Sequence, residues 1–313
     1  MHKLFLTFDT EDFISKNSVP ALNKTVELLN KYELKGLFFI TGHMAEKLCS
    51  FPETIDLLSM HQIGFHTSSH SVHPTVFEFT DVESYEEAYR TSLQRETAHI
   101  NPLSGAVEGK GGIYALRALF PQKQINSFRA PGFCWTPPHL DALKTLGISY
   151  DFSAALSVDI CSYNGINFYP RPTPYIYHAR TNYKFVLDLL IHNVSVFMLH
   201  PSDMVNQQGW DLIYHKSNPI TLIEPTLQSP KEISILFHEF EMFLRRLSSL
   251  KKLGVLEVTP PLKSSKRTIN PTLPQVERCY AYSMDWAVSW FKYQPQFLHN
   301  HFEKFFRINS ATR

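Results

Sequence analysis

Two histidines four residues apart, His66 and His70, have the spacing that most directly suggests metal chemistry. Imidazole nitrogens bind divalent transition metals, and a helical turn would bring both rings to one face. The chain has 15 histidines, so a surface or capping pair is the simpler alternative. A third histidine, His73, lies in Ser-Val-His-Pro and is a candidate substrate contact or a structural turn residue.

Three carboxylates, Asp9, Glu11 and Asp12, follow a short apolar run at the start of the chain. Acids packed together at a strand end repel one another unless a cation or an arginine compensates their charge. A divalent metal with two neutral histidine ligands favours an anionic oxygen ligand, and a hydrolase also needs a separate base. This cluster can supply both groups, although a solvated acidic turn is the alternative.

Three further polar residues each end a strand-like run. Arg129 lies in Phe-Arg-Ala-Pro-Gly, where it can bind a carboxylate through two hydrogen bonds. Asp151 lies in Tyr-Asp-Phe-Ser, and His200 in Met-Leu-His-Pro. A histidine that ends an apolar strand is often a core residue, so His200 alone does not indicate a catalytic role.

The elements that must position these residues alternate between strand-like and helix-like sequence. We expect strands at 3–8, 37–40, 63–65, 127–128, 148–150, 194–199 and 255–258, and helices at 20–34, 52–60, 82–99, 137–146 and 231–253. Near-continuous apolar strands between helices predict a parallel sheet covered by helices. The polar residues all follow strand ends, which favours a closed or nearly closed β/α barrel over an open sheet.

Two regions interrupt this alternation. Residues 102–112 contain four glycines and are interpreted as a connecting loop, because no Gly-Lys-Ser/Thr follows to make a phosphate-binding loop. Residues 260–274 are polar and contain prolines, as in a linker. We therefore predict a barrel over 1–262 and a linker with an aromatic-rich helical extension over 263–313. The extension either folds back over the barrel or presents an amphipathic face to a membrane or a partner.

Composition excludes several classes of function. The chain has 313 residues, 43% hydrophobic and 19% charged, with a net charge of +1, which gives no basic field for nucleic acid. Its four scattered cysteines form no zinc or redox motif and suggest free thiols in a reducing compartment. The first apolar run is too short for a signal peptide, and no run reaches the roughly 18 apolar residues of a transmembrane helix. We expect a cytoplasmic protein; peripheral membrane contact and oligomer formation stay open.

Taken together and in order, these motifs resemble the polysaccharide deacetylase family, also called the NodB homology or carbohydrate esterase family 4 group. The resemblance spans roughly residues 3–260 and is most specific in His-x-x-x-His, in Arg-Ala-Pro-Gly and in Leu-Gly-Ile-Ser-Tyr-Asp. It implies a distorted (β/α)7-type barrel and a divalent metal, most often zinc, with cobalt, nickel or iron as alternatives.

The resemblance also assigns roles to individual residues. It implies that His66 and His70 bind the metal, that Asp9 is the catalytic base and that Arg129 orients this base. His200 matches the general acid, and Asp151 matches the partner that tunes it. Pro131 and Gly132, with His73, are expected to contact substrate.

This chain departs from the common family pattern at two places. Most members have two adjacent aspartates, and the second binds metal, whereas here Thr10 follows Asp9 and cannot be an anionic ligand. The ligand is then Glu11 in first place or Asp12 in second. The tryptophan that often follows the fourth motif is also missing, and Ala154 and Ala155 lie near that position.

The expected function is removal of an N-acetyl group from an amino sugar in polysaccharide or glycoconjugate biosynthesis. One alternative is a deformylase or another amidohydrolase that acts on a lipid-linked sugar or a small cyclic amide. The other alternative is a carbohydrate-binding barrel without catalytic activity.

Overall fold

The computed structural model describes residues 1–70, 75–153, 156–157, 159–174, 193–209, 222–264, 273–291 and 293–311. Its main sheet follows the spatial order β10-β11-β1-β2-β3-β6-β7-β9-β8, and β12 also pairs with β1. The strands are β1 (His2–Thr10), β2 (Leu37–Ile40), β3 (Gln62–Phe65), β6 (Ser127–Phe128), β7 (Tyr150–Asp151), β8 (Cys161–Tyr163), β9 (Ile166–Phe168), β10 (Thr173–Pro174), β11 (Val194–Leu199) and β12 (Leu256–Val258). Every neighbouring pair in this sheet is parallel except β8 and β9.

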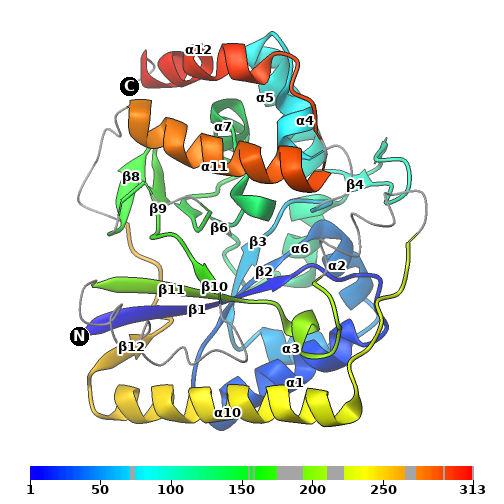
Figure 1. Ribbon diagram of the computed structural model, residues 1–313, viewed down its shortest axis with the longest axis vertical. Helices are drawn as coiled ribbons and strands as arrows, with labels where there is room; N and C mark the ends of the chain where they lie inside the picture. Colours follow the sequence, from blue (N-terminus) through cyan, green and yellow to red (C-terminus); the bar gives the residue numbers. More distant parts are fainter. Residues whose placement is uncertain are drawn as a thin grey trace.

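The sheet is curled, and its strands change direction steadily from β1 to β9 (Figure 1). Within the described residues the path is open, with β10 and β8 at its ends. The expected α/β fold of the distorted barrel type is confirmed: over the described residues the sheet forms a curled half-barrel.

Helices connect the strands and cover the convex face of the sheet. They are α1 (Ser18–Lys31), α2 (Gly42–Leu48), α3 (Pro52–Leu58), α4 (Val76–Thr80), α5 (Tyr85–Glu96), α6 (Gly112–Leu119), α7 (Pro137–Thr145) and α10 (Pro230–Lys252). Each expected helix is present, with ends displaced by a few residues. The short helices α2, α4 and α6 were not predicted. Neither was the small hairpin of β4 (His99–Ile100) and β5 (Val107–Glu108), of which β4 precedes the expected glycine-rich loop and β5 lies within it.

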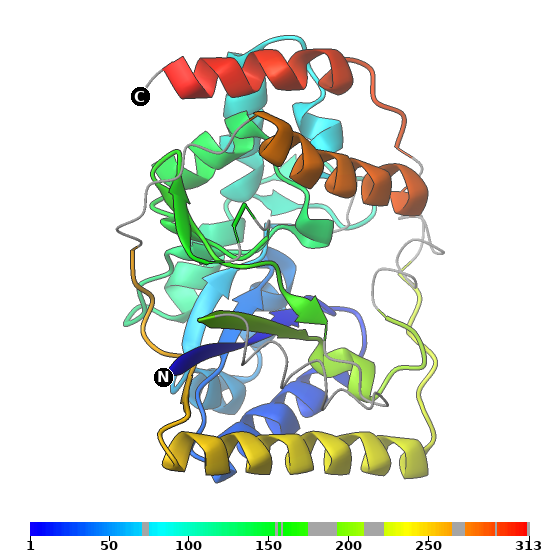
Figure 2. The ribbon, with the colours of Figure 1, turned by 60° about the vertical axis from the view of Figure 1, so that its left-hand side comes forward.

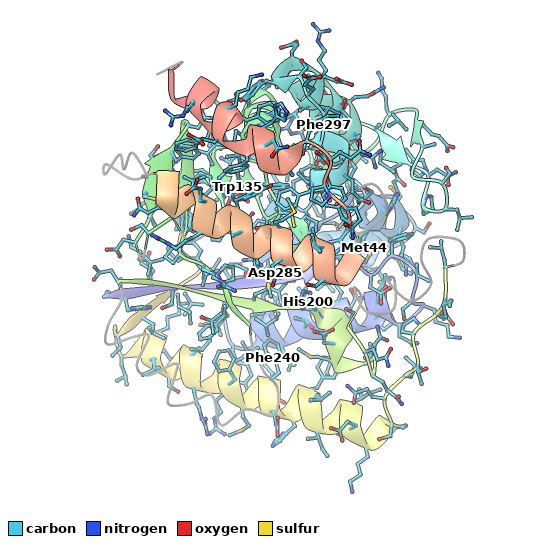
Figure 3. All side chains as sticks on the ribbon, turned by 45° about the horizontal axis from the view of Figure 1, so that its top comes forward. Met44, Trp135, His200, Phe240, Asp285 and Phe297 are labelled. Carbon is cyan, nitrogen blue, oxygen red and sulfur yellow. The ribbon has the colours of Figure 1, made fainter. Side chains whose placement is uncertain are left out.

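Side chains of β1 alternate between two environments, as a strand requires. Leu4, Leu6 and Phe8 join the large core beneath the helices, where Phe8 contacts Phe38 and Phe240. Figure 3 shows Phe240 projecting from α10 towards the sheet. Phe5 faces the other side, in a second apolar cluster with residues such as Phe39, Phe152 and Tyr169.

Strand register brings the polar residues to one edge of the sheet. Phe8 pairs with Leu199, and Thr10 pairs with Ile40, which pairs with Phe65. Phe65 in turn pairs with Phe128, and Phe128 with Asp151. The residues that follow these positions therefore share the carboxyl edge of the sheet, where β/α barrels place their catalytic groups.

The C-terminal extension folds back over the barrel. It consists of α11 (Leu273–Phe291) and α12 (Leu298–Ala311), which lie against the α4, α5 and α7 side of the molecule in both views (Figures 1 and 2). Val276, Phe302 and Phe306 belong to the main core, so the extension shares the core of the barrel. None of the helices in the described ranges is long and apolar enough to cross a membrane.

Candidate active site and metal centre

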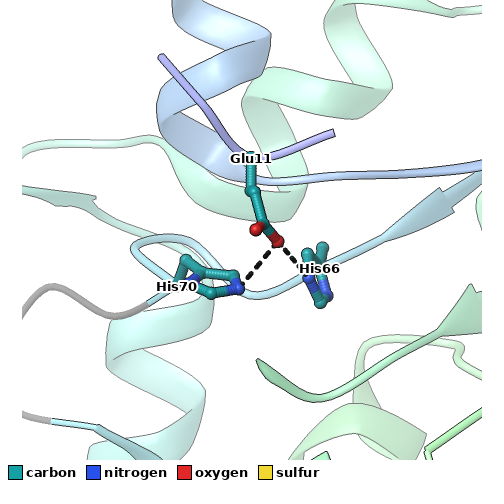
Figure 4. Close-up of side chains that lie close together, drawn as sticks. All are labelled: Glu11, His66 and His70. Atoms are coloured by element: carbon teal, nitrogen blue, oxygen red, sulfur yellow. Dashed lines mark hydrogen bonds and ion pairs between the residues drawn. The ribbon is translucent and has the colours of Figure 1, made fainter. Parts of the chain in front are cut away.

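Three buried side chains from two strand ends meet at the carboxyl edge of the sheet. The Oε2 atom of Glu11 lies 3.1 Å from Nε2 of His66 and 2.8 Å from Nε2 of His70 (Figure 4). All three residues are buried, and their ligand atoms lie within 4.8 Å of one another. Two imidazoles and a carboxylate are a donor set that catalytic zinc sites use.

The hydrogen bond of His66 to a backbone carbonyl indicates that the Glu11, His66 and His70 group suits a cation. Its Nδ1 lies 2.7 Å from the backbone oxygen of Arg129, which can only accept, so Nδ1 carries the hydrogen. In the neutral ring Nε2 then presents its lone pair to the Glu11 carboxylate. These two electron-rich groups attract only if a proton or a metal ion lies between them, and a histidine that donates its other N–H to a carbonyl is the usual arrangement of a metal ligand.

The segment that carries both histidines is a loop, not the helical turn that the spacing suggested. Thr67 has φ 61° and His70 has φ 51°, in the left-handed region that side chains rarely adopt. The Thr67 hydroxyl accepts the backbone N–H of His70 at 2.9 Å and so closes the loop. The two rings therefore converge without the helical turn.

Asp12, the second candidate for the anionic ligand, has a different role. Its Oδ1 accepts the backbone N–H groups of Ile14 and Ser15, and its Oδ2 accepts the side-chain amide of Asn206. Burial raises the pKa of Asp12. The described residues contain two groups of potential metal ligands, Glu11 with His66 and His70, and Asp9 with Glu11 and His200. Asp12 belongs to neither group. We interpret Asp12 as the residue that fixes the turn after β1, and Glu11 as the ligand.

Asp9 is held on one side by a buried arginine. Arg129 donates from Nη1 to Oδ1 of Asp9 at 2.6 Å and from Nη2 to the Thr7 hydroxyl at 2.8 Å. The guanidinium also lies over the ring of Phe39. The other oxygen of Asp9, Oδ2, lies 4.0 Å from Nε2 of His66 and 3.7 Å from Nε2 of His200. Asp9 therefore presents one oriented oxygen to the candidate metal site, as a base would.

His200 approaches the site from β11, the strand next to β1 (Figure 3). Its Nε2 faces Asp9 and lies 3.8 Å from Oε1 of Glu11. Its Nδ1 lies 3.2 Å from Oδ2 of Asp203, on the short 3₁₀ helix Pro201–Met204. Its side chain is 25% exposed, whereas those of Asp9 and Glu11 are almost fully buried. His200 therefore lies where a reactant can reach it.

Asp203 was not among the residues predicted from the sequence. The spacing His-Pro-Ser-Asp was the available signal, because a proline after the histidine can start a 3₁₀ turn that brings position i+3 back to position i. The sequence assigned this partner role to Asp151. In the structure the carboxylate of Asp151 accepts the N–H and the hydroxyl of Ser153, and the Ser153 hydroxyl accepts the N–H of Ala130. Asp151 thereby supports the loop that carries Arg129.

Negative charge around His200 favours its protonated form. Burial alone would lower the pKa of His200, but Glu11, Asp203 and Asp9 together raise it well above its ordinary value. Burial would likewise raise the pKa of Glu11, and the site histidines outweigh it and hold that pKa well below its ordinary value. The site therefore combines an ionised carboxylate with an imidazolium that can donate a proton.

The expected substrate-binding residues are only partly described. Pro131 and Gly132 form a short 3₁₀ turn directly after the Arg129 loop, with Gly132 at φ 54°. His73, Ala154 and Ala155 lie outside the described residues. The Ser283 hydroxyl of α11 donates to the backbone oxygen of Phe133 in this turn at 2.7 Å.

Comparison with known proteins agrees with these features. Residues 2–150 match the family model described as polysaccharide deacetylase. The match includes the residues of the metal group together with Asp9 and Arg129, while His200 and Asp203 lie beyond it. A comparison with curated protein sequences finds no match.

Several solved structures match this chain over most of its length at low sequence identity. The catalytic domain of a peptidoglycan N-acetylglucosamine deacetylase from Eubacterium rectale is 15% identical, with 85% of this chain and 91% of that chain covered and a TM-score of 0.43. A family 4 carbohydrate esterase from Streptomyces lividans is 12% identical, with coverages of 86% and 98% and a TM-score of 0.42. Another family 4 carbohydrate esterase, from Bacillus anthracis, is 16% identical, with coverages of 80% and 82% and a TM-score of 0.37.

Proposed function

We propose that the protein is a metal-dependent hydrolase that removes an N-acetyl group from an amino sugar. The match of residues 2–150 to the polysaccharide deacetylase family model supports this proposal. The observation that carries the proposal is that a potential metal-ligand group, a candidate base and a candidate proton donor meet at the carboxyl edge of the sheet. Glu11 and two histidines form a metal-ligand group, Asp9 presents an oriented carboxylate oxygen, and His200 faces both. Metal-dependent amide hydrolysis uses a metal ion, a base and a proton donor, which these groups would supply.

The proposed metal ligands are Glu11, His66 and His70, with zinc as the first choice and cobalt, nickel or iron as alternatives. A divalent ion held there would act as a Lewis acid that polarises the acyl carbonyl and makes water a better nucleophile. Because only three protein ligands converge, the arrangement suits a catalytic site, which keeps a position open for a reactant.

Two residues beside the proposed metal ligands, Asp9 and His200, each carry out one of the two proton transfers. Asp9 accepts the proton from the attacking water through Oδ2, because Arg129 occupies Oδ1. His200, kept protonated by the nearby carboxylates, donates a proton from Nε2 to the leaving amine. Asp203 accepts a hydrogen bond from Nδ1 and so directs the other nitrogen towards the reacting atoms. The two proton transfers thus use two groups whose facing atoms lie 3.7 Å apart.

The substrate class is tested by a panel of amides. Purified protein is incubated with N-acetylated amino sugars, with their N-formyl counterparts and with a small cyclic ureide, and the released acid or amine is measured. We expect acetate release from at least one N-acetylated amino sugar, abolished by a chelator and restored by zinc. Turnover of the formyl or ureide compounds alone would replace the proposal with the related amidohydrolase activity. Glycan binding without any hydrolysis would support a non-catalytic barrel.

A further inference from the structure

A buried carboxylate on a distant helix holds the loop between the two site histidines. Oε2 of Glu96, near the end of α5, accepts the backbone N–H of Ser68 at 2.9 Å. Ser68 is the middle residue between His66 and His70. Ser68 is 3% exposed and Glu96 is 1% exposed, so water does not compete for this hydrogen bond. The contact therefore fixes the centre of the His66–His70 loop against α5.

Glu96 is itself oriented by a buried histidine on another helix. Nε2 of His139, on α7, lies 2.9 Å from Oε1 of Glu96, and His139 is 0% exposed. The ring of His139 packs edge-on against Phe128 and Phe79. Placing a carboxylate in such surroundings costs free energy unless hydrogen-bond donors surround it. The Ser68 N–H and the His139 ring supply one donor for each Glu96 oxygen.

The loop needs anchors because its backbone is strained. Thr67 and His70 both have positive φ, which L residues adopt at a cost in free energy. The carbonyls of Thr67 and Ser68 accept the N–H groups of Gly42 and His43 at 3.0 and 3.1 Å, at the start of α2. These bonds hold the loop on its α2 side, and Glu96 holds it on the opposite side through the N–H of the same peptide segment.

We propose that Glu96, oriented by His139, is a positioning residue that sets the distance between His66 and His70 and thereby the affinity of the metal site. The effect on metal affinity rests on the proposed function. The anchoring of the loop is independent of the proposed function, because it follows from the hydrogen bonds of Glu96. Residues that hold metal ligands in place typically change metal affinity about 10- to 100-fold when they are replaced.

The first test measures the loop without metal. Hydrogen exchange of the amides at 66–70 is compared in metal-free wild type, Glu96→Ala, Glu96→Gln and Glu46→Ala. Glu46 pairs with His99 at 2.8 Å in the same way but at a half-exposed position, so it is the matched control. We expect faster exchange at 66–70 in Glu96→Ala and a smaller effect in Glu96→Gln, whose amide oxygen can still accept the Ser68 N–H. Unchanged exchange in Glu96→Ala, or an equal change in Glu46→Ala, would overturn the inference.

The second test measures the affinity for Co²⁺, whose visible absorption reports the ligands. Glu96→Ala should bind Co²⁺ about 10- to 100-fold more weakly than wild type, and Glu46→Ala should bind it equally well. Equal affinity in wild type and Glu96→Ala would overturn the inference and leave the proposed function intact. A wild type that binds no Co²⁺ would instead contradict the proposed function and the consequence for affinity. If Glu96→Ala does not fold, His139→Ala removes the partner of Glu96 and should change both measurements in the same direction.

Discussion

At the scale of single residues, Asp9 and Glu11 are close in the sequence but have different bonding partners in the site. Asp9 and Glu11 are two positions apart, so the alternation of a strand directs both to the same side. Asp9 is bound by Arg129 on one oxygen, whereas Glu11 meets two imidazoles. This difference in partners supports the proposed roles, with Asp9 as the base and Glu11 as the metal ligand, and neither role requires a charge at Thr10.

Replacement of the general acid gives the cleanest functional test at this scale. His200→Gln should lower kcat about 100- to 10,000-fold, because the leaving amine loses its proton donor. Zinc content and thermal stability should stay close to wild type, since His200 lies outside the Glu11, His66 and His70 group. Near wild-type turnover would remove His200 from the mechanism.

Asp9→Asn should also lose activity. Its unfolding free energy should fall as well, because the substitution leaves the buried Arg129 without its anionic partner.

The partner of His200 controls the pH range of activity. The pKa of His200 is raised, so this acid stays protonated, and activity persists, until the pH passes the raised value. Asp203→Asn removes one of the charges that raise the pKa, so the decline of kcat at high pH should begin at lower pH. Asp56→Asn, an exposed carboxylate on α3, is the control. A pH profile that is the same for Asp203→Asn and wild type would show that Asp203 does not act on His200.

At the scale of elements, the metal loop depends on close approach between α2, α5 and α6. Gly112 begins α6 with φ 54°, and a Cβ there would lie 2.1 Å from the Ser68 hydroxyl and 2.4 Å from the backbone oxygen of Glu96. The peptide oxygen cannot move freely, so any larger residue displaces the loop. Short helices that were not predicted from the sequence thus determine how the His-x-x-x-His segment is held.

A matched pair of glycine substitutions tests this packing. Gly112→Ala and Gly109→Ala share a positive φ, but a Cβ at Gly109 meets nothing within 4 Å. Both variants should pay a similar backbone cost, about 1 kcal/mol. Only Gly112→Ala should also weaken zinc binding, which is measured by competition with a chelating dye. Equal zinc affinities in the two variants would argue against packing at α6 as a determinant of the loop.

Sequence reasoning predicted the elements that depend on local pattern. The bounds of β2 and β11 agree with the expected strands, because their apolar runs are short and end at polar residues. The motifs that carry chemistry follow strand ends and were found for the same reason. Glu96 and His139 were not found, since their roles depend on contacts between elements and no local pattern separates them from ordinary surface acids and histidines. Asp203 was missed although the His-Pro-Ser-Asp spacing offered a local signal.

At the scale of the whole molecule, the C-terminal extension packs against the barrel and shares its core. Asp81, after α4, accepts the N–H groups of Gln296, Phe297 and Leu298 at the start of α12 and also the hydroxyl of Tyr293. The Ser283 hydroxyl reaches the turn after Arg129. The extension therefore folds back over the barrel, as one of the two expected alternatives.

Loss of the Asp81 contacts should loosen the extension. Asp81→Ala removes a helix cap and leaves backbone N–H groups without their partner, so we expect the unfolding free energy to fall by about 1–3 kcal/mol. Urea denaturation measures this loss, and limited proteolysis should show earlier cleavage within 296–311. Glu303→Ala on the exposed face of α12 pairs only with Arg307 at the surface and should change little. Equal stability of both variants would contradict a role for Asp81 in docking the extension.

The assignment of Glu11 as the anionic metal ligand is the central claim of this account. The most direct measurement is zinc content together with acetate release for wild type, Glu11→Gln and Asp12→Asn. We predict about one zinc ion per chain in wild type and in Asp12→Asn, both with activity, and loss of zinc and activity in Glu11→Gln. Retention of zinc and activity by Glu11→Gln, or loss of zinc from Asp12→Asn alone, would contradict the account.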